Sequence, residues 1–251
     1  MPRLERDGVG IYFEVAGKGD PILLSHGYSA TCAMWADQVA ALQDRYTVIT
    51  WDMRGHGNSD SPEDPALYSE SHCVGDMKAL LNELGFASAI IGGLSLGGYM
   101  SLAFYLAHPQ MVRALMLFDT GPGYKNDQAR EQWNETAEQR AQRFEDEGLG
   151  SVGRGDETRL AQHRSAAGLA HAARGMLKQF DDRVMTSLPG IQVPTLVLVG
   201  ERDRAYHGAT DYMANKIPES QKVVIPDAGH AANLHQPEAF NRAVLEFLNR
   251  L

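Results

Sequence analysis

Short apolar runs rich in β-branched residues alternate with helical patterns along most of this chain, and this alternation limits the folds open to it. Such alternation is typical of a mainly parallel sheet with helices on both faces, so we expect an α/β fold. An alternating stretch at 10–15, followed by a Gly-Lys-Gly-Asp turn, also predicts an opening antiparallel hairpin. The predicted parallel strands cover 21–25, 46–51, 88–94, 113–118, 195–199 and 222–225.

The alternation breaks between Gly121 and Leu188, where no strand-like run occurs and polar helical segments take over. Elsewhere the spacing of apolar residues predicts helices over 69–84, 96–107 and 237–248. We therefore expect an interrupted core domain with a small helical cap, or lid, inserted into it. The core would consist of residues 1–120 and 189–251, and the cap of residues 121–188.

Two apolar stripes at helical spacing predict that the inserted segment contains at least two amphipathic helices. A glycine-rich stretch at 148–155 is expected to connect them flexibly. The stripes either attach the insertion to the sheet or roof a cleft, as lids do. The first stripe is Trp133, Ala137, Ala141 and Phe144, and the second is Leu160, Ala167, Ala170, Ala173, Leu177 and Phe180.

The composition excludes several classes of partner. A formal net charge of −9 argues against nucleic acid, because binding to phosphates requires a basic patch. No window approaches the roughly 18 consecutive apolar residues of a membrane helix, so no membrane partner is expected. Residues 1–7 lack the apolar core of a secretory signal, which favours a cytoplasmic location. Cys32 and Cys73 are too few for a disulfide framework, and the nine histidines form no metal-binding pattern.

A single serine stands among glycines where an apolar strand passes directly into a helix. Residues 93–97 read G-L-S-L-G, which fits the G-x-S-x-G pattern with Ser95 at its centre. In such a turn the small neighbours let the strand and helix pass closely while the hydroxyl points out above the sheet. The stretch lacks both the Lys-Ser/Thr of a phosphate-binding loop and the spacing of a dinucleotide fingerprint. Ser95 is therefore a candidate nucleophile.

A serine nucleophile needs a base and an orienting acid, and the chain supplies both further along. Asp203 follows the strand at 195–199, and His230 lies in the loop after the strand at 222–225. Loops at the carboxyl ends of parallel strands converge on one cleft, so these side chains can meet Ser95 there. Asp119, which follows an earlier strand, remains an alternative acid, and His235 an alternative base.

These motifs together resemble the α/β-hydrolase fold superfamily, in its capped serine esterase and enol-lactonase-like branch. Besides G-L-S-L-G-G, the resemblance rests on S-H-G-Y at 25–28 and D-M-R-G-H-G-N-S at 52–59. It also rests on G-E-R-D at 200–203, on Gly229-His230, and on the order serine, acid, histidine. The resemblance implies a mostly parallel central sheet with helices on both faces and a helical cap.

The resemblance also implies a role for each site residue. Ser95 would be the nucleophile, His230 the general base and acid, and Asp203 the group that fixes the imidazole tautomer. The backbone N–H groups of Tyr28 and Leu96 would form the oxyanion hole. The Tyr28 side chain would also line the substrate pocket, as would Trp133, whereas packing is expected for Met34, Tyr99 and Phe144. No cofactor is implied.

The function implied is hydrolysis of small carboxylic esters or lactones through an acyl-enzyme. The same triad also serves thioester hydrolysis and carbon–carbon bond cleavage, and a ligand sensor that signals through a protein partner could retain it. Arg54 could bind a substrate carboxylate, or it could tie its own loop to neighbouring carbonyls. The expected partner is a small-molecule ester or lactone, and the protein would act as a monomer or homodimer.

Overall fold

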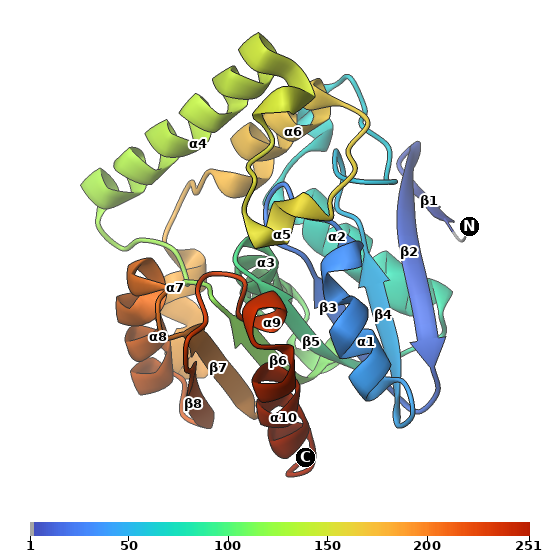
Figure 1. The fold of residues 1–251 in the computed structure, drawn as a ribbon, viewed down its shortest axis with the longest axis vertical. Helices are drawn as coiled ribbons and strands as arrows, with labels where there is room; N and C mark the ends of the chain where they lie inside the picture. Colours follow the sequence, from blue (N-terminus) through green and yellow to red (C-terminus); the bar gives the residue numbers. More distant parts are fainter. Residues whose placement is uncertain (1–2) are drawn as a thin grey trace.

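One mostly parallel sheet forms the centre of the molecule (Figure 1). The computed structural model describes residues 3–251. Met1 and Pro2, which belong to the predicted core domain and to the segment predicted to lack a signal sequence, lie outside the described residues. The strands are β1 Arg3–Arg6, β2 Val9–Gly17, β3 Asp20–Ser25, β4 Tyr46–Trp51, β5 Ala89–Leu94, β6 Val112–Phe118, β7 Thr195–Gly200 and β8 Ser220–Ile225. The strand order within these residues is β1-β2-β4-β3-β5-β6-β7-β8. β1 pairs antiparallel with β2 and β2 with β4, and the other pairs are parallel.

Helices cover both faces of the sheet, as predicted from the strand–helix alternation, and the predicted fold class is confirmed. The α-helices are α1 Ala36–Leu42, α2 Glu70–Glu83, α3 Leu96–Ala107, α4 Asp127–Glu147, α5 Asp156–Arg159, α6 Ala166–Ala172, α7 Arg183–Ser187, α8 Arg204–Lys216, α9 Ala232–His235 and α10 Pro237–Leu248. Shorter helical turns are η1 Cys32–Trp35, η2 Pro65–Leu67, η3 Pro109–Met111, η4 Gly148–Ser151, the π-helical η5 Ala173–Leu177 and η6 Leu188–Gly190.

The buried core divides into two clusters, one on each face of the sheet, because alternate strand residues point to opposite sides. Leu23 faces one cluster together with apolar residues of α2, α3 and α8. Its neighbours Ile22 and Leu24 face the other, together with residues of α1 and α10. The parallel strands read as continuous apolar runs because both of their faces are buried.

The predicted strands and helices match the observed ones closely. Ser69 caps α2, its side chain accepting a hydrogen bond from the N–H of His72. Gly85 follows the end of that helix at φ 76°, a left-handed conformation that glycine adopts more readily than other residues. The last strand begins earlier than predicted, at Ser220, because its polar first residues pair with β7 at the sheet edge. The prediction named no residues for α1 and α8.

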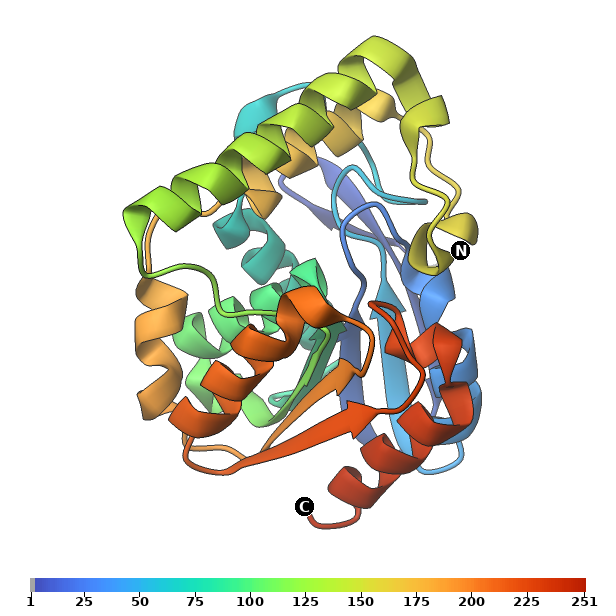
Figure 2. The ribbon, with the colours of Figure 1, turned by 60° about the vertical axis from the view of Figure 1, so that its left-hand side comes forward.

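The inserted segment between β6 and β7 is helical, and its long helix α4 lies across the top of the molecule with α6 beneath it (Figure 2). Ala137, Ala141 and Phe144 of the first stripe are buried there. The second stripe is interrupted: α5 ends at Arg159, and Leu160 and Phe180 are exposed. Part of the predicted glycine-rich connection also forms the turn η4.

No helix within residues 3–251 has the length and apolar character needed to cross a membrane.

Candidate active site

Ser95 alone forms the turn between β5 and α3. Its backbone has φ 54° and ψ −115°, a conformation that costs a non-glycine residue about 1–3 kcal/mol. The surroundings hold this conformation: Ser95 N–H donates to Phe118 O at 3.0 Å, and Thr120 Oγ1 donates to Ser95 O at 2.6 Å. Strain maintained in this way is a common property of functional turns.

The glycines on either side of Ser95 are required by close backbone contacts. A Cβ on Gly93 would lie 2.4 Å from the carbonyl carbon of Gly97. A Cβ on Gly97 would lie 2.1 Å from the carbonyl oxygen of Ser25. The strand and the helix can therefore cross only where both positions lack a side chain, and this crossing raises Ser95 above the sheet.

The loop after β3 brings Tyr28 next to the same turn. A Cβ on the preceding Gly27 would lie 3.5 Å from Ser95 Cβ, so this backbone packs directly against the serine. Leu96 is the first residue of α3, where backbone N–H groups have no acceptor within the helix. Tyr28, Leu96 and Ser95 all line one cavity.

Asp203 and His230 meet at the carboxyl ends of β7 and β8. Asp203 Oδ2 lies 2.8 Å from His230 Nδ1, so the carboxylate accepts a hydrogen bond from the Nδ1–H of the ring. This leaves Nε2 as the nitrogen free to accept a proton. Both residues line the cavity that Ser95 lines. Within residues 3–251 no direct hydrogen bond joins Ser95 to His230.

Tyr206, one helical turn after Asp203, is a site residue that the sequence analysis missed. Its ring stacks on the His230 imidazole, with centroids 4.8 Å apart and planes 25° apart. Burial raises the pKa of Tyr206, and a smaller effect of hydrogen bonding to the Ser95 side chain lowers it. Two residues at the start of α8 therefore contact the His230 ring: Asp203 is hydrogen-bonded to its edge, and Tyr206 stacks on its face.

Burial lowers the pKa of His230, whereas its hydrogen bond to Asp203 and the charge of that carboxylate raise it. The nearby carboxyl groups of Asp119 and Glu157 act in the same direction as Asp203. As a result the pKa of His230 lies above its usual value of about 6.5.

Asp119, the alternative acid, faces backbone groups instead of the imidazole. Its Oδ1 accepts a hydrogen bond from Gly200 N–H at 2.7 Å, and its Oδ2 accepts one from Ala232 N–H at 3.4 Å. The side chain is fully buried, and this burial raises its pKa to about 8. Asp119 therefore connects β6 to β7 and to α9, whereas Asp203 contacts His230.

The cavity has a volume of about 690 Å³ and lies between the sheet edge and the inserted helices. Trp133 of α4 lines it, held by a hydrogen bond from Nε1 to Leu177 O at 2.8 Å. Tyr99, for which packing was expected, also reaches the lining. Two charged side chains from the inserted segment, Arg140 and Glu157, complete the wall. A volume of this size suits a small organic molecule.

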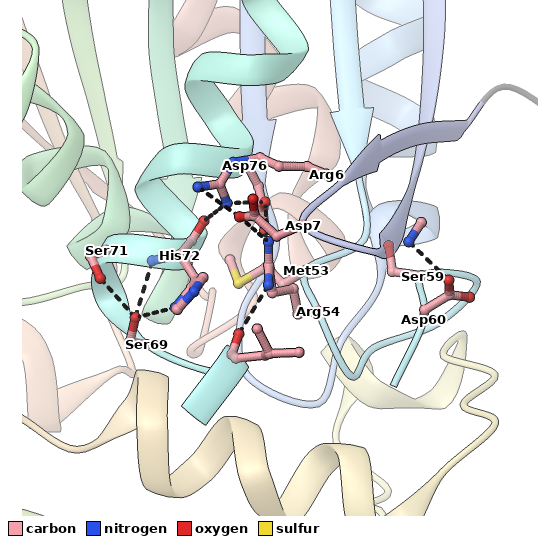
Figure 3. A network of polar contacts seen from close by, with 12 residues as sticks. Arg6, Asp7, Met53, Arg54, Ser59, Asp60, Ser69, Ser71, His72 and Asp76 are labelled. Carbon is pink, nitrogen blue, oxygen red and sulfur yellow. Dashed lines mark hydrogen bonds and ion pairs between the residues drawn. The ribbon is translucent and has the colours of Figure 1, made fainter. Parts of the chain in front are cut away.

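Arg54 lies outside this cavity in a buried ion pair (Figure 3). Its Nε and Nη2 donate to the Asp76 carboxylate at 2.6 and 2.8 Å, and Nη1 donates to Leu67 O at 3.1 Å. Arg6 contacts the same carboxylate at 2.9 Å. Arg54 therefore joins its loop to α2 and is not available for a substrate carboxylate.

Two other histidines, His26 and His235, also hold loops. His26 Nε2 accepts a hydrogen bond from Met53 N–H at 2.9 Å, so its Nδ1 donates to Gly27 O. His235 Nδ1 accepts from Gly229 N–H at 2.8 Å, and its Nε2 lies 2.6 Å from Asp156 of the inserted segment. Across residues 3–251 no group of three or more His, Cys, Asp or Glu side chains is arranged to hold a metal ion.

Comparison with known proteins places this geometry among hydrolases. The sequence model described as the alpha/beta hydrolase family matches residues 22–243. The chain is 32% identical to 3-oxoadipate enol-lactonase 1 of Acinetobacter baylyi over 245 residues, which cover 87% of this chain and 85% of that protein.

Two solved structures extend the similarity to the whole chain. A thermophilic esterase from Thermogutta terrifontis, with malate bound, superposes with a TM-score of 0.86 at 32% identity, covering 100% of this chain and 99% of the esterase. The enol-lactonase from Burkholderia xenovorans superposes with a TM-score of 0.79 at 26% identity, covering 99% and 100% of the two chains.

Proposed function

The chain belongs to the alpha/beta hydrolase family, and on this basis we propose that it is a serine hydrolase of small carboxylic esters or lactones. The observation that carries this proposal is the Asp203–His230 contact of 2.8 Å at the wall of a cavity that Ser95 also lines. The names of the related enol-lactonase and esterase support the substrate class.

In the proposed acylation step, Ser95 Oγ attacks the carbonyl carbon while His230 Nε2 takes the hydroxyl proton. The backbone N–H groups of Tyr28 and Leu96 stabilise the oxyanion of the tetrahedral intermediate. Collapse of this intermediate breaks the bond to the alcohol oxygen, and His230 returns the proton to that oxygen. The acyl group remains on Ser95 as an ester.

In the proposed deacylation step, water enters in place of the alcohol and gives a proton to His230 Nε2. The resulting hydroxide attacks the acyl carbonyl, and the second intermediate collapses to release the acid and restore the Ser95 hydroxyl. Asp203 stabilises the imidazolium in both steps without itself being protonated. Before attack, the Ser95 hydroxyl must form a hydrogen bond to Nε2, since catalytic hydrogen bonds often form only when substrate is bound.

The segment at 121–188 would act as the cap over this reaction. Trp133, Arg140 and Glu157 from the cap region line the cavity that Ser95 and His230 line from the core. Tyr28 Oη donates to Leu169 O of α6 at 2.8 Å, which joins the proposed oxyanion loop to the cap. We accordingly assign residues 1–120 and 189–251 to the core domain.

Initial rates with 4-nitrophenyl acetate, 4-nitrophenyl butyrate and an aromatic lactone test the proposal, comparing wild type with Ser95→Ala. We expect sustained turnover by wild type and loss of nearly all of it in the variant. Ser71→Ala, an exposed change on α2, is the matched control and should leave the rate unchanged. A rate unaffected by Ser95→Ala would contradict the proposal, and a single turnover without recovery would favour a ligand sensor.

A further inference from the structure

One buried oxygen in the cavity wall has no hydrogen-bond partner in the folded chain. Among residues 3–251, six buried side-chain nitrogen or oxygen atoms lack such a partner. Gln179 Oε1 is the only one of the six that belongs to a residue lining the cavity of Ser95 and His230. The Gln179 residue is only 8% exposed. The cavity wall therefore contains a buried acceptor that the described residues do not use.

The main chain of Gln179 is held in place without its side-chain amide. Its N–H donates to Asn134 Oδ1 at 2.8 Å, and its carbonyl oxygen accepts from Asn134 Nδ2 at 2.7 Å. Two residues earlier, Leu177 O accepts a hydrogen bond from Trp133 Nε1 at 2.8 Å. Asn134 and Trp133 both belong to α4, so this helix anchors residues 177–179 to the inserted segment. None of these contacts uses the Gln179 amide.

Gly123 leaves room for the Gln179 amide in the cavity wall. A Cβ on Gly123 would lie 2.7 Å from Gln179 Oε1 and 3.2 Å from the carbon that carries this oxygen. Gly123 has φ 93°, in the region that favours glycine, and it lines the same cavity. Both the backbone conformation and the missing side chain at this position therefore allow the amide to lie there.

The energetics of the unpartnered Gln179 oxygen favour a ligand with a hydrogen-bond donor. Burying an amide oxygen without a hydrogen bond costs free energy that an apolar side chain of similar size would not. A bound molecule that brings a donor to Oε1 removes this cost, and an analogue without the donor does not. A carboxylate carries only acceptors and cannot satisfy Oε1, whereas a hydroxyl or an amide N–H can.

We propose that Gln179 determines specificity by accepting, at Oε1, a hydrogen bond from a hydroxyl or N–H group of the substrate. The preferred substrates are small esters or lactones that carry such a neutral donor in addition to the bond that is cleaved. This inference rests on the proposed function and specifies its substrate class. One neutral hydrogen bond should change kcat/KM by about tenfold.

Three pairs of esters test the inference, and in each pair a carbon group replaces the donor. In the first pair, 4-nitrophenyl 3-hydroxybutanoate is compared with 4-nitrophenyl 3-methylbutanoate, which has a methyl group instead of the hydroxyl. In the second, 4-nitrophenyl N-acetyl-β-alaninate is compared with 4-nitrophenyl 5-oxohexanoate, which has a methylene instead of the N–H. In the third, 2-hydroxyethyl butanoate is compared with propyl butanoate, so that the donor lies in the alcohol part.

We expect Gln179→Met to lower kcat/KM about tenfold for the donor ester of at least one pair and to leave the other ester of that pair unchanged. Methionine is similar to glutamine in size but is only a weak acceptor. Gln179→Glu keeps acceptor oxygens at this position and should retain the preference for the donor ester. Gln142→Met, an exposed change on α4, is the matched control and should leave both esters unaffected.

The pair that responds distinguishes a hydroxyl from an N–H donor and the acyl part from the alcohol part. Equal effects of Gln179→Met within every pair, or no effect in any pair, would overturn the Gln179 inference while leaving the hydrolase proposal intact. If wild type cleaves none of the esters, the hydrolase proposal fails, and NMR titration of the same esters still tests Gln179. Gln179→Met should then weaken the binding of a donor ester about tenfold but not that of its partner. Unchanged affinities in every pair would reject the inference.

Discussion

Asp203 accepts a hydrogen bond from His230 at 2.8 Å, and the two residues reach this contact from the ends of neighbouring strands. The pairing of β7 with β8 brings Gly200 opposite Ile225, so the loops that follow begin at the same edge of the sheet. Tyr206 then covers one face of the imidazole. This arrangement engages Nδ1 of His230 and leaves Nε2 as the nitrogen that can accept a proton.

The first prediction concerns the choice of acid. Asp203→Asn should lower kcat by about 10⁴-fold, because an amide at this position favours the wrong imidazole tautomer. Asp119→Asn should change kcat far less, since Asp119 contacts backbone N–H groups and not the ring. Steady-state kinetics of the two variants at one pH make the comparison. A larger loss in Asp119→Asn would reverse the assignment.

The second prediction concerns pH. Burial lowers the pKa of His230, but Asp203 together with the carboxyl groups of Asp119 and Glu157 raises it above its usual value, and only neutral His230 can act as the base. The value of kcat/KM should therefore fall on the acid side with a midpoint above about 6.5. A pH–rate profile in constant ionic strength measures this midpoint. A midpoint clearly below that value would show that burial dominates.

The third prediction concerns stability. The pKa of Asp119 is about 8 in the folded protein and about 3.9 in an unfolded chain, so the folded state binds the extra proton between these values. The contribution of this group to the free energy of unfolding is present below pH 4 and is lost as the pH rises to about 8. Asp119→Asn should therefore flatten the pH dependence of stability.

Urea unfolding at pH 5 and at pH 8 checks this third prediction. The difference in unfolding free energy between the two pH values should be smaller in Asp119→Asn than in wild type. An equal difference in both proteins would mean that Asp119 is ionised in the folded state throughout this range.

The fourth prediction separates the two contributions of Tyr206. Tyr206→Phe keeps the ring on His230 and should change kcat by less than about threefold. Tyr206→Leu removes the stacking, for which aromatic pairs gain about 0.5–1.5 kcal/mol, and should lower kcat by up to about tenfold. Tyr212→Leu, elsewhere in the cavity wall, is the control. Equal losses in the Phe and Leu variants would assign the effect to the phenol oxygen instead.

The fold could be predicted because its signals are local. Each parallel strand is an apolar run buried on both faces. Ser95 stands between Gly93 and Gly97, where close backbone contacts leave no room for a side chain. The second apolar stripe of the insertion does not correspond to one continuous helix, because α5 ends at Arg159 and α6 begins only at Ala166. The spacing of apolar residues alone does not show this interruption. Leu160 was counted in that stripe but is exposed.

The finer site could be predicted only in part because it depends on contacts between distant segments. Asp119 and Asp203 both follow strands, and only the three-dimensional structure distinguishes the backbone partners of one from the imidazole partner of the other. Tyr206 had a usable signal, its position one helical turn after Asp203. Arg140 had one too, its two-turn spacing from Trp133, and both residues line the cavity.

Covalent labelling of the nucleophile is the most direct test of the proposed reaction. The protein would be incubated with a fluorophosphonate ester, its intact mass measured, and the modified peptide sequenced by tandem mass spectrometry. We predict one adduct per chain, located on Ser95 and absent from Ser95→Ala. An adduct on another residue, or an unmodified Ser95 in a protein that still hydrolyses esters, would contradict the role of Ser95 as the nucleophile.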